Sequence, residues 1–244
     1  MRQFALYLNS VGYQAYIASP DKNIRHYTFI PYIFTHGEIE RILANSDQLC
    51  PHRHSTIPFI MPVILRILYG CGLRISEAVN LKNKNVNLQE GVLEIKNSKF
   101  GKDRLVPMSE TMALICRQYY QIFHKHSSMN DYFFMKANRQ PVTRDNVYRR
   151  FREILWDSGI SHGGKGTGPR LHDLRHTYAV HALKRAVDRK IDVYCALPIL
   201  STYMGHASVE ATSQYVRLTA DAFPDICAAL EHTCGHVIPE VIWE

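Results

Sequence analysis

The sequence predicts an α+β fold that is mainly α-helical and contains one small, three-stranded antiparallel sheet. Apolar residues recur at helical spacing over most of the 244 residues, whereas three short segments between positions 85 and 108 alternate apolar and polar residues. With 46% hydrophobic and 21% charged residues, the chain has an ordinary globular composition and is long enough to bury a sizeable core.

The N-terminal segment from Arg2 to Tyr16 has helical apolar spacing and is followed by a turn-rich basic stretch. A helix of this size cannot bury its apolar face by itself. Two interpretations stay open from the residues alone. The segment is either an arm packed on the main domain or the last helix and linker of a further domain.

The compact region is expected to begin near Pro31. Thr35, followed three residues later by Glu38, predicts a capped helix that continues to about Asn45. Further helices are expected over 57–69, 76–81, 109–126, 143–158, 172–187, 196–204, 208–216 and 221–232. Strands are expected over 85–88, 92–97 and 104–108, with turns at 90–91 and 100–101.

Charge and cysteine usage limit the classes of partner and compartment. A net charge of +7 and a pI near 9.1 favour a polyanionic partner, although many basic proteins bind nothing acidic. The six cysteines show no close pairing, and Cys71 and Cys116 lie among apolar residues, which indicates reduced thiols and a reducing cytosol. The sequence has no signal peptide and no apolar run of about 18 residues. A soluble, cytoplasmic protein is expected.

The most informative constellation consists of two arginines, two or three imidazoles and one phenol. Arg74 follows a glycine-rich turn, Arg175 stands three residues after His172 on one helix face, and His206 follows a glycine. Converging guanidinium groups suit a phosphate, because each offers a planar fork of donors to its oxygens. Beside them, the phenolate of Tyr215 is a candidate nucleophile that would form a covalent phosphotyrosine.

Each of these residues also has an ordinary structural interpretation. Arg74 is spaced to form a surface ion pair with Glu77, three residues on. His206 is typical of a solvated loop histidine, and Tyr215 of a half-buried core tyrosine. The order and spacing of the residues carry the functional argument.

Five motifs in this order resemble those of the tyrosine recombinases, also called phage integrases. The resemblance extends from about residue 31 to about residue 230. The motifs lie at 72–81, 99–108, 172–177, 204–208 and 212–215.

The resemblance implies a role for each member of the constellation. Tyr215 would attack the scissile phosphate to give a 3′-phosphotyrosyl bond and a free 5′-hydroxyl. Arg74 and Arg175 would hold the non-bridging oxygens and stabilise the transition state. His172 would deprotonate or orient the phenol, and His206 would hydrogen-bond the phosphate.

Lys99 matches the general acid that protonates the leaving 5′-oxygen, with Lys96 and Lys102 as rival candidates in the same hairpin. A model tyrosine has a pKa of about 10. We therefore expect the cationic, imidazole-lined pocket to favour the phenolate of Tyr215. Neither a metal, ATP nor another cofactor is expected to take part.

The resemblance further implies a division into domains and a set of partners. Residues 1–30 would be the remnant helix and linker of an N-terminal core-binding domain, 31–232 the catalytic domain, and 233–244 a C-terminal tail. The chain would thus be a truncated recombinase with weak, salt-sensitive DNA affinity. Its partners would be double-stranded DNA, three further copies in a tetramer on DNA, and accessory recombination proteins, with no membrane. Subunits would exchange segment 220–230.

Basic side chains elsewhere are expected to contact the DNA backbone, although a solvated helix face explains half of them equally well. These are Lys82, Lys84, Arg144, Arg149, Arg150, Arg152, Lys165 and Arg170. Cysteine–histidine clusters at 50–54 and 232–236 lack the two-pair spacing of a structural zinc site, so solvated histidines are expected there. Three rival functions stay open: type IB topoisomerase-like relaxation, a non-catalytic DNA-binding regulator, and, more remotely, a metal-dependent nuclease.

Overall fold

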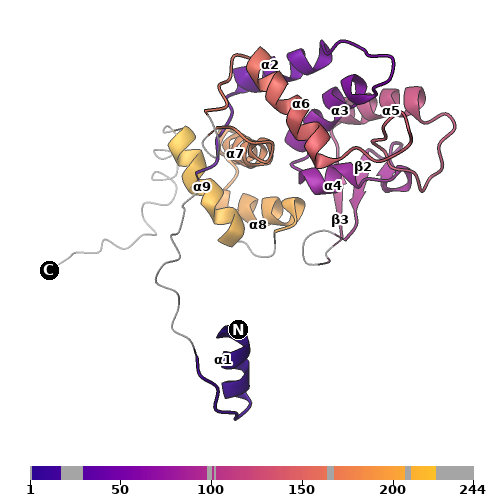
Figure 1. Cartoon of the computed structure of the whole chain (residues 1–244). Coiled ribbons are helices and arrows are strands. Elements are labelled where there is room, and N and C mark those ends of the chain that lie inside the picture. Colours follow the sequence, from indigo (N-terminus) through magenta and orange to yellow (C-terminus); the bar gives the residue numbers. More distant parts are fainter. Residues whose placement is uncertain are drawn as a thin grey trace. The chain divides into compact units, whose positions relative to one another are not determined.

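The computed structural model describes residues 2–17, 30–97, 101, 103–163, 168–206 and 210–223. The chain divides into two compact units, residues 1–30 and 31–244, which are described separately (Figure 1). In the first unit, α1 (Arg2–Ser10) is shorter than the predicted helix. Gly12 adopts a φ of +91°, and the side-chain amide of Asn9 hydrogen-bonds both backbone groups of Ala15 at 2.8 and 2.9 Å. These bonds replace the helical pattern after Ser10.

The second unit is built around the apolar helix α3 (Ile57–Gly70), which packs against α2 (His36–Asp47), α5 (Glu110–Phe123) and α6 (Arg144–Asp157). The side chain of Thr35 accepts a hydrogen bond from the Glu38 amide, and Glu38 reciprocates, so the predicted capping box is confirmed. Because α3 is apolar on nearly all sides, it lies in the centre of the larger hydrophobic core.

The predicted sheet is present as β1 (Val86–Asn87), β2 (Val92–Ile95) and β3 (Arg104–Pro107), antiparallel in the order β1-β2-β3. Leu93 pairs with Val86 on one side and Val106 on the other, and all three side chains are buried. β2 ends two residues before the predicted boundary, and Asn97 beyond it adopts a φ of +48°. The 3₁₀ turn Asn83–Asn85 precedes β1.

Two of the remaining helices pack against α7 (Asp173–Asp188). Figure 1 shows α7 with α8 (Val193–Met204) and α9 (Glu210–Ala222) beside it, and α3 also contacts it. Their apolar side chains form a second core that includes Tyr215. The short helix α4 (Ile75–Val79) follows α3.

Two predicted boundaries in this region were wrong. α8 begins three residues early, because the carbonyl of Asp192 accepts hydrogen bonds from Cys195 and Ala196 and so starts the helix before its apolar run. The two helices predicted over 208–216 and 221–232 are one continuous helix as far as Ala222, since Val216 and Leu218 pack on the second core. Residues 224–232 lie outside the described part of the chain.

The α+β, mainly helical fold class with its small sheet is thus confirmed. Cys71 and Cys116 are free and buried, as expected for reduced core thiols. Within the described ranges, no helix is long and apolar enough to cross a membrane.

Candidate active site

The buried guanidinium of Arg175 joins two of the sequence motifs. Its side chain is only 2% exposed, and it donates to the carbonyl of Gly72 and, at 2.7 Å, to the carbonyl of Met204. Gly72 has a φ of +60°, and a Cβ there would lie 2.5 Å from the Tyr178 ring. Only glycine satisfies both constraints, so the turn brings its carbonyl to the arginine.

Arg74 reaches the same loop from the N-terminus of α4. Its Nη2 donates to the carbonyl of Gly205 at 3.1 Å, and its Nη1 donates to Glu77 at 2.8 Å. Its side chain is 19% exposed, in contrast to the buried Arg175. The two arginines therefore converge on residues 204–205, as the constellation predicted, with Arg74 on the accessible side.

Glu77 and Arg104 complete this network, and the sequence argument missed the role of both. Arg104 on β3 donates from both terminal nitrogens to the Glu77 carboxylate at 2.8 and 2.9 Å, and its Nε donates to the carbonyl of Tyr203. Burial opposes ionisation of Glu77, but hydrogen bonds and charge from Arg104 and Arg74 lower its pKa to about 2. The predicted Arg74–Glu77 ion pair exists, but it belongs to a buried network that includes Arg104 and is not a surface pair.

Tyr215 is 1% exposed, and its hydroxyl lies 2.9 Å from Nδ1 of His176. The His206 ring stacks on the phenol ring with centroids 6.0 Å apart, and its Nδ1 lies 2.7 Å from the hydroxyl of Thr212. The His172 ring lies at a right angle to the His176 ring, with centroids 4.8 Å apart. The structure thus brings all the predicted histidines and the tyrosine together and adds His176, which sequence reasoning did not single out.

The imidazoles of the pocket are neutral near pH 7. Desolvation, followed by the charge of Arg175, lowers the pKa of both His172 and His206 to about 4. Desolvation and the neighbouring His172 lower the pKa of His176 to about 3. Neutral rings can accept a proton or a hydrogen bond.

The expectation that the pocket favours the phenolate was wrong for this structure. Burial raises the pKa of Tyr215, and the opposing charges of Arg175 and Arg74 do not outweigh it. The physical reason is that burial penalises an anion directly, whereas the imidazoles that were expected to add positive charge are themselves neutral.

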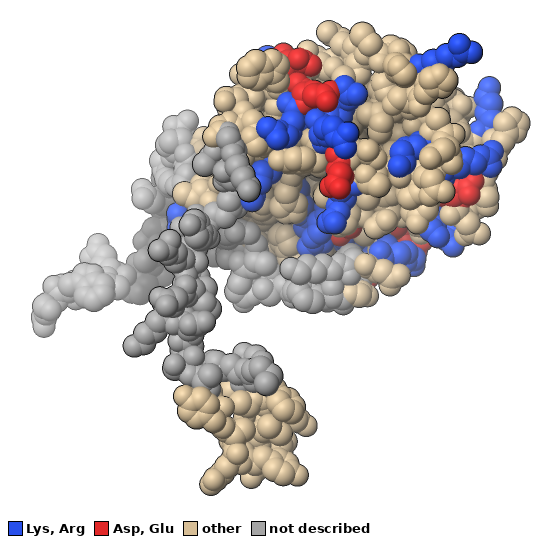
Figure 2. Space-filling view, in the orientation of Figure 1, with Lys and Arg blue, Asp and Glu red and all other residues tan. Residues whose placement is uncertain are grey.

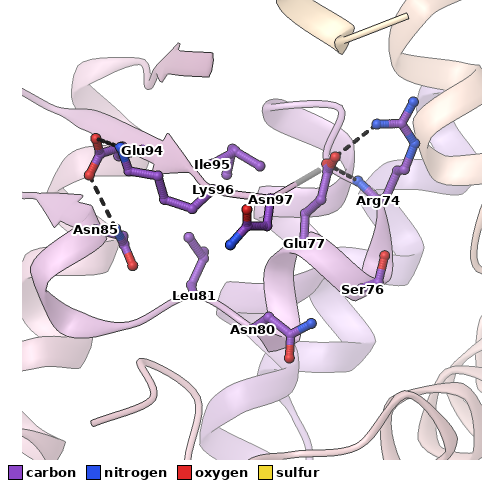
Figure 3. Close-up of a pocket in the computed structure, with 10 residues that line it drawn as sticks. All are labelled: Arg74, Ser76, Glu77, Asn80, Leu81, Asn85, Glu94, Ile95, Lys96 and Asn97. Carbon is purple, nitrogen blue, oxygen red and sulfur yellow. Dashed lines mark hydrogen bonds and ion pairs between the residues drawn. The ribbon is translucent and has the colours of Figure 1, made fainter. Parts of the chain in front are cut away.

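A polar groove leads away from Arg74. Its first section, of about 340 Å³, lies between α4 and β2, with Arg74 and Glu77 at one end and Asn85 and Glu94 at the other (Figure 3). An adjoining section of about 570 Å³ shares Asn80, Asn85, Glu94, Lys96 and Asn97 with the first, and Lys82, Lys84 and Tyr132 also line it.

The other predicted DNA contacts are more dispersed. Arg144 and Arg149 are exposed on α6, and neither is among the described residues that line the groove. The charge of Arg170 acts on the pKa of His176, and Arg170 also interacts with Asp173. Figure 2 shows basic side chains spread over this face of the 31–244 unit, with acidic ones among them. Lys165 lies outside the described residues.

The predicted general acid also lies outside the described residues, as does its rival Lys102. The other rival, Lys96, forms ion pairs with Glu94 at 2.6 Å and with Asp103 at 3.3 Å. Hydrogen bonds to these two carboxylates raise the pKa of Lys96, which makes it a weaker acid. Among the described residues, no cluster of three or more histidine, cysteine or acidic side chains could hold a metal ion.

Solved structures of site-specific recombinases share this fold. The chain aligns with the XerA recombinase crystal structure at a TM-score of 0.62 and 23% identity, covering 97% of this chain and 74% of that one. A XerH site-specific recombinase, solved as a post-cleavage complex with a palindromic difH substrate, aligns at a TM-score of 0.67 and 21% identity. This alignment covers 89% of the present chain and 60% of the XerH chain. The fold is that of a tyrosine recombinase catalytic domain.

Sequence comparison gives the family. Residues 33–221 match the model of the phage integrase family, and the chain therefore belongs to that family. It is 31% identical over 206 residues to a putative integrase/recombinase, y4rB, of Sinorhizobium fredii, which covers 82% of this chain and 66% of that protein. It is 32% identical over 161 residues to the tyrosine recombinase XerA of Pyrococcus furiosus, which covers 65% and 50%. The chain thus spans about half to two thirds of the length of these relatives.

Proposed function

We propose that this chain is the catalytic part of a site-specific DNA recombinase that cleaves and rejoins strands through a 3′-phosphotyrosyl bond to Tyr215. The observation that carries the proposal is the convergence of Arg74 and Arg175 on residues 204–205, beside the buried phenol and the imidazoles. Membership of the phage integrase family supports the same activity.

The arginines are suited to hold the scissile phosphate. Arg74 donates one hydrogen bond from Nη1 to the Glu77 carboxylate and one from Nη2 to the Gly205 carbonyl. Because a guanidinium has five N–H donors, further donors remain for phosphate oxygens. Arg175 is held by two backbone carbonyls, which fixes its orientation before substrate binds. Preorganised donors of this kind stabilise the charge that develops on phosphorus oxygens in the transition state.

In this reaction the Tyr215 oxygen attacks phosphorus, and the bond from phosphorus to the 5′-oxygen breaks. Lys99 is our candidate to protonate the departing oxygen, since its hairpin follows directly on Lys96 and Asn97 in the groove wall. The pairing of Lys96 with two carboxylates supports this choice over Lys96 itself. A 5′-hydroxyl from another strand reverses the attack and rejoins the DNA, which needs no external energy source.

The groove beside Arg74 is our proposed path for the DNA backbone, with Lys82 and Lys84 contacting phosphates. Positioning by lysine is chiefly electrostatic and independent of sequence. Complexes of XerH with difH DNA support DNA as the partner.

Strand exchange between two duplexes further implies an assembly of four subunits, with accessory recombination proteins and exchange of segment 220–230 as additional expectations. The interpretation of residues 1–30 as the end of an N-terminal domain also stays a proposal.

Covalent trapping tests the proposed function. Labelled nicked duplexes from DNA flanking the gene are incubated with the protein in chelator, denatured in detergent, and scored for a slowly migrating adduct. The wild type is expected to form the adduct, Tyr215→Phe to form none, and Tyr120→Phe, a half-buried tyrosine on α5, to match the wild type.

Three outcomes contradict the proposal. DNA binding without an adduct in the wild type indicates a DNA-binding regulator. An adduct accompanied by plasmid relaxation, but by no recombinant product, indicates a topoisomerase-like enzyme. An adduct that persists in Tyr215→Phe shows that a residue other than Tyr215 is the nucleophile.

A further inference from the structure

The hydroxyl of Tyr215 has one partner among the described side chains, and that partner is His176. The Oη–Nδ1 distance is 2.9 Å, and the two rings are tilted by 46° with centroids 5.6 Å apart. A buried phenol normally requires such a partner, because an unpaired hydroxyl is costly away from water. The contact therefore fixes where the oxygen of the proposed nucleophile lies.

The other two histidines of the pocket have different contacts. His206 stacks on the face of the phenol and uses its Nδ1 on Thr212, which belongs to the same helix as the tyrosine. The His172 ring packs at a right angle to the His176 ring. Of the three imidazoles, His176 is the one whose ring nitrogen lies at the reacting oxygen.

From this geometry we propose that His176 is a catalytic residue that orients the Tyr215 hydroxyl and accepts its proton as the oxygen attacks phosphorus. This inference rests on the proposed function. As the oxygen–phosphorus bond forms and the bond to the 5′-oxygen breaks, the phenolic proton moves to Nδ1 of His176. The departing 5′-oxygen takes a different proton, from the general acid. In the reverse step, His176 returns its proton to the phenol.

The electrostatics of the pocket are consistent with this role. After desolvation, the largest influences on the pKa of His176 come from His172, Arg175, Arg170 and His206. Together with desolvation they lower the pKa of His176 to about 3, so its ring is neutral and Nδ1 is free to accept the hydrogen bond. A phosphodiester bound by Arg74 and Arg175 adds a negative charge beside the ring, which favours the imidazolium at the moment of proton transfer.

Two substitutions separate the hydrogen bond from the proton transfer. The side chain of Asn places an amide near the position of Nδ1, so His176→Asn keeps an acceptor that cannot take up a proton. His176→Phe removes both functions while keeping a planar ring. His126→Asn, at an exposed position outside the pocket, is the control for the substitution itself. Urea unfolding confirms that each variant is folded before its kinetics are measured.

The measurement is the first-turnover rate of adduct formation on a nicked duplex, from about pH 6 to about pH 8. We expect both His176 variants to react at least about 100-fold more slowly than the wild type, in the range of general base catalysis. We expect the rate of His176→Asn to rise with pH, since its phenol must ionise to solvent, whereas the wild-type rate is nearly flat.

A second substrate shows whether the loss of rate in the His176 variants arises at the nucleophile or at the leaving group. With sulfur in place of the bridging 5′-oxygen, the leaving group departs without a proton, so any defect in the general acid is relieved. The losses in the His176 variants are expected to persist on this substrate. Recovery to the wild-type rate would show that His176 serves the leaving group and would overturn the proposal.

Other outcomes also decide the question. A rate for His176→Phe within about twofold of the wild type overturns the proposal, and a faster rate shows that the hydrogen bond holds Tyr215 back. A wild-type rate for His176→Asn with a flat pH profile removes the role as proton acceptor. In all three cases the wild type still forms its adduct, so the proposed function stands. A wild type that forms no adduct overturns the proposed function and the inference together.

The hydrogen bond itself is tested without DNA. In ¹⁵N-histidine-labelled protein, the neutral His176 ring is expected to carry its proton on Nε2, with an Nδ1 signal that shifts in Tyr215→Phe. An Nδ1 signal that does not respond to this substitution overturns the geometry on which the inference depends.

Discussion

Replacing Glu77 by Gln tests whether the buried carboxylate stabilises the fold by joining Arg74, at the start of α4, to Arg104 on β3. The carboxylate accepts hydrogen bonds from Arg74 and from both terminal nitrogens of Arg104, and its side chain is only 5% exposed. Its pKa of about 2, against an ordinary value of 4.5, corresponds to roughly 3 kcal/mol of interaction with the ionised form. We expect Glu77→Gln to lower the free energy of unfolding by about this amount at neutral pH.

The pH dependence gives the prediction a second, independent test. Because the pKa of Glu77 is depressed on folding, its stabilisation is complete above the unfolded value and is lost as the pH falls toward the folded value. The difference between wild type and Glu77→Gln should narrow by roughly 1.4 kcal/mol between about pH 7 and about pH 3.5, as the wild-type carboxyl becomes protonated in the unfolded chain.

Urea unfolding followed by circular dichroism measures both quantities, from the midpoint and the slope at each pH. The matched control is Glu153→Gln, whose carboxylate forms an exposed pair with Arg150 on α6 and is 48% exposed. Exposed pairs contribute at most about 1 kcal/mol, so the control should be nearly neutral. A loss for Glu77→Gln no larger than the control, or one that is independent of pH, would refute the network as a source of stability.

Two further predictions concern the turn at the site and the groove. Gly72→Ala should lower the free energy of unfolding by more than about 2 kcal/mol, because a left-handed φ and a clash with a tyrosine ring act together. The control is Gly101→Ala, at a position with a φ of +67° and no atom within 4 Å. It should show only the backbone strain of about 1–2 kcal/mol. Equal losses in urea unfolding would contradict the clash. Lys82→Gln and Lys84→Gln should each reduce the salt dependence of DNA binding, with the slope of log K against log salt falling by about 0.9 per phosphate contact. Lys125→Gln, outside the groove, should leave that slope unchanged in anisotropy titrations, and an equal effect at all three positions would argue against the groove as the DNA path.

Much of the fold was predictable because it depends on local patterns. The capping box at Thr35, the apolar helix after residue 57 and the alternation that forms β1–β3 are each visible within a few neighbouring residues. The errors had both local and tertiary causes. Side-chain bonds from Asn9 to Ala15 replaced helical bonds after Ser10, whereas packing on the second core carried α9 through residues 217–220.

The sequence by itself determined the chemistry that this protein has available: two arginines, two or three imidazoles and a phenol in motifs whose order indicates the family. It could not determine which imidazole meets the phenol, since His172 is the N-cap of α7 and His176 follows one turn later, and only the packing of α9 selects His176. Nor could it show that Arg104, on β3, shares Glu77 with Arg74. Such contacts join segments far apart in the chain, and burial then sets the charges: it keeps the imidazoles neutral and raises the pKa of Tyr215 despite two arginines nearby. Composition fixes the number of ionisable groups, but their protonation depends on desolvation, which only the tertiary structure creates.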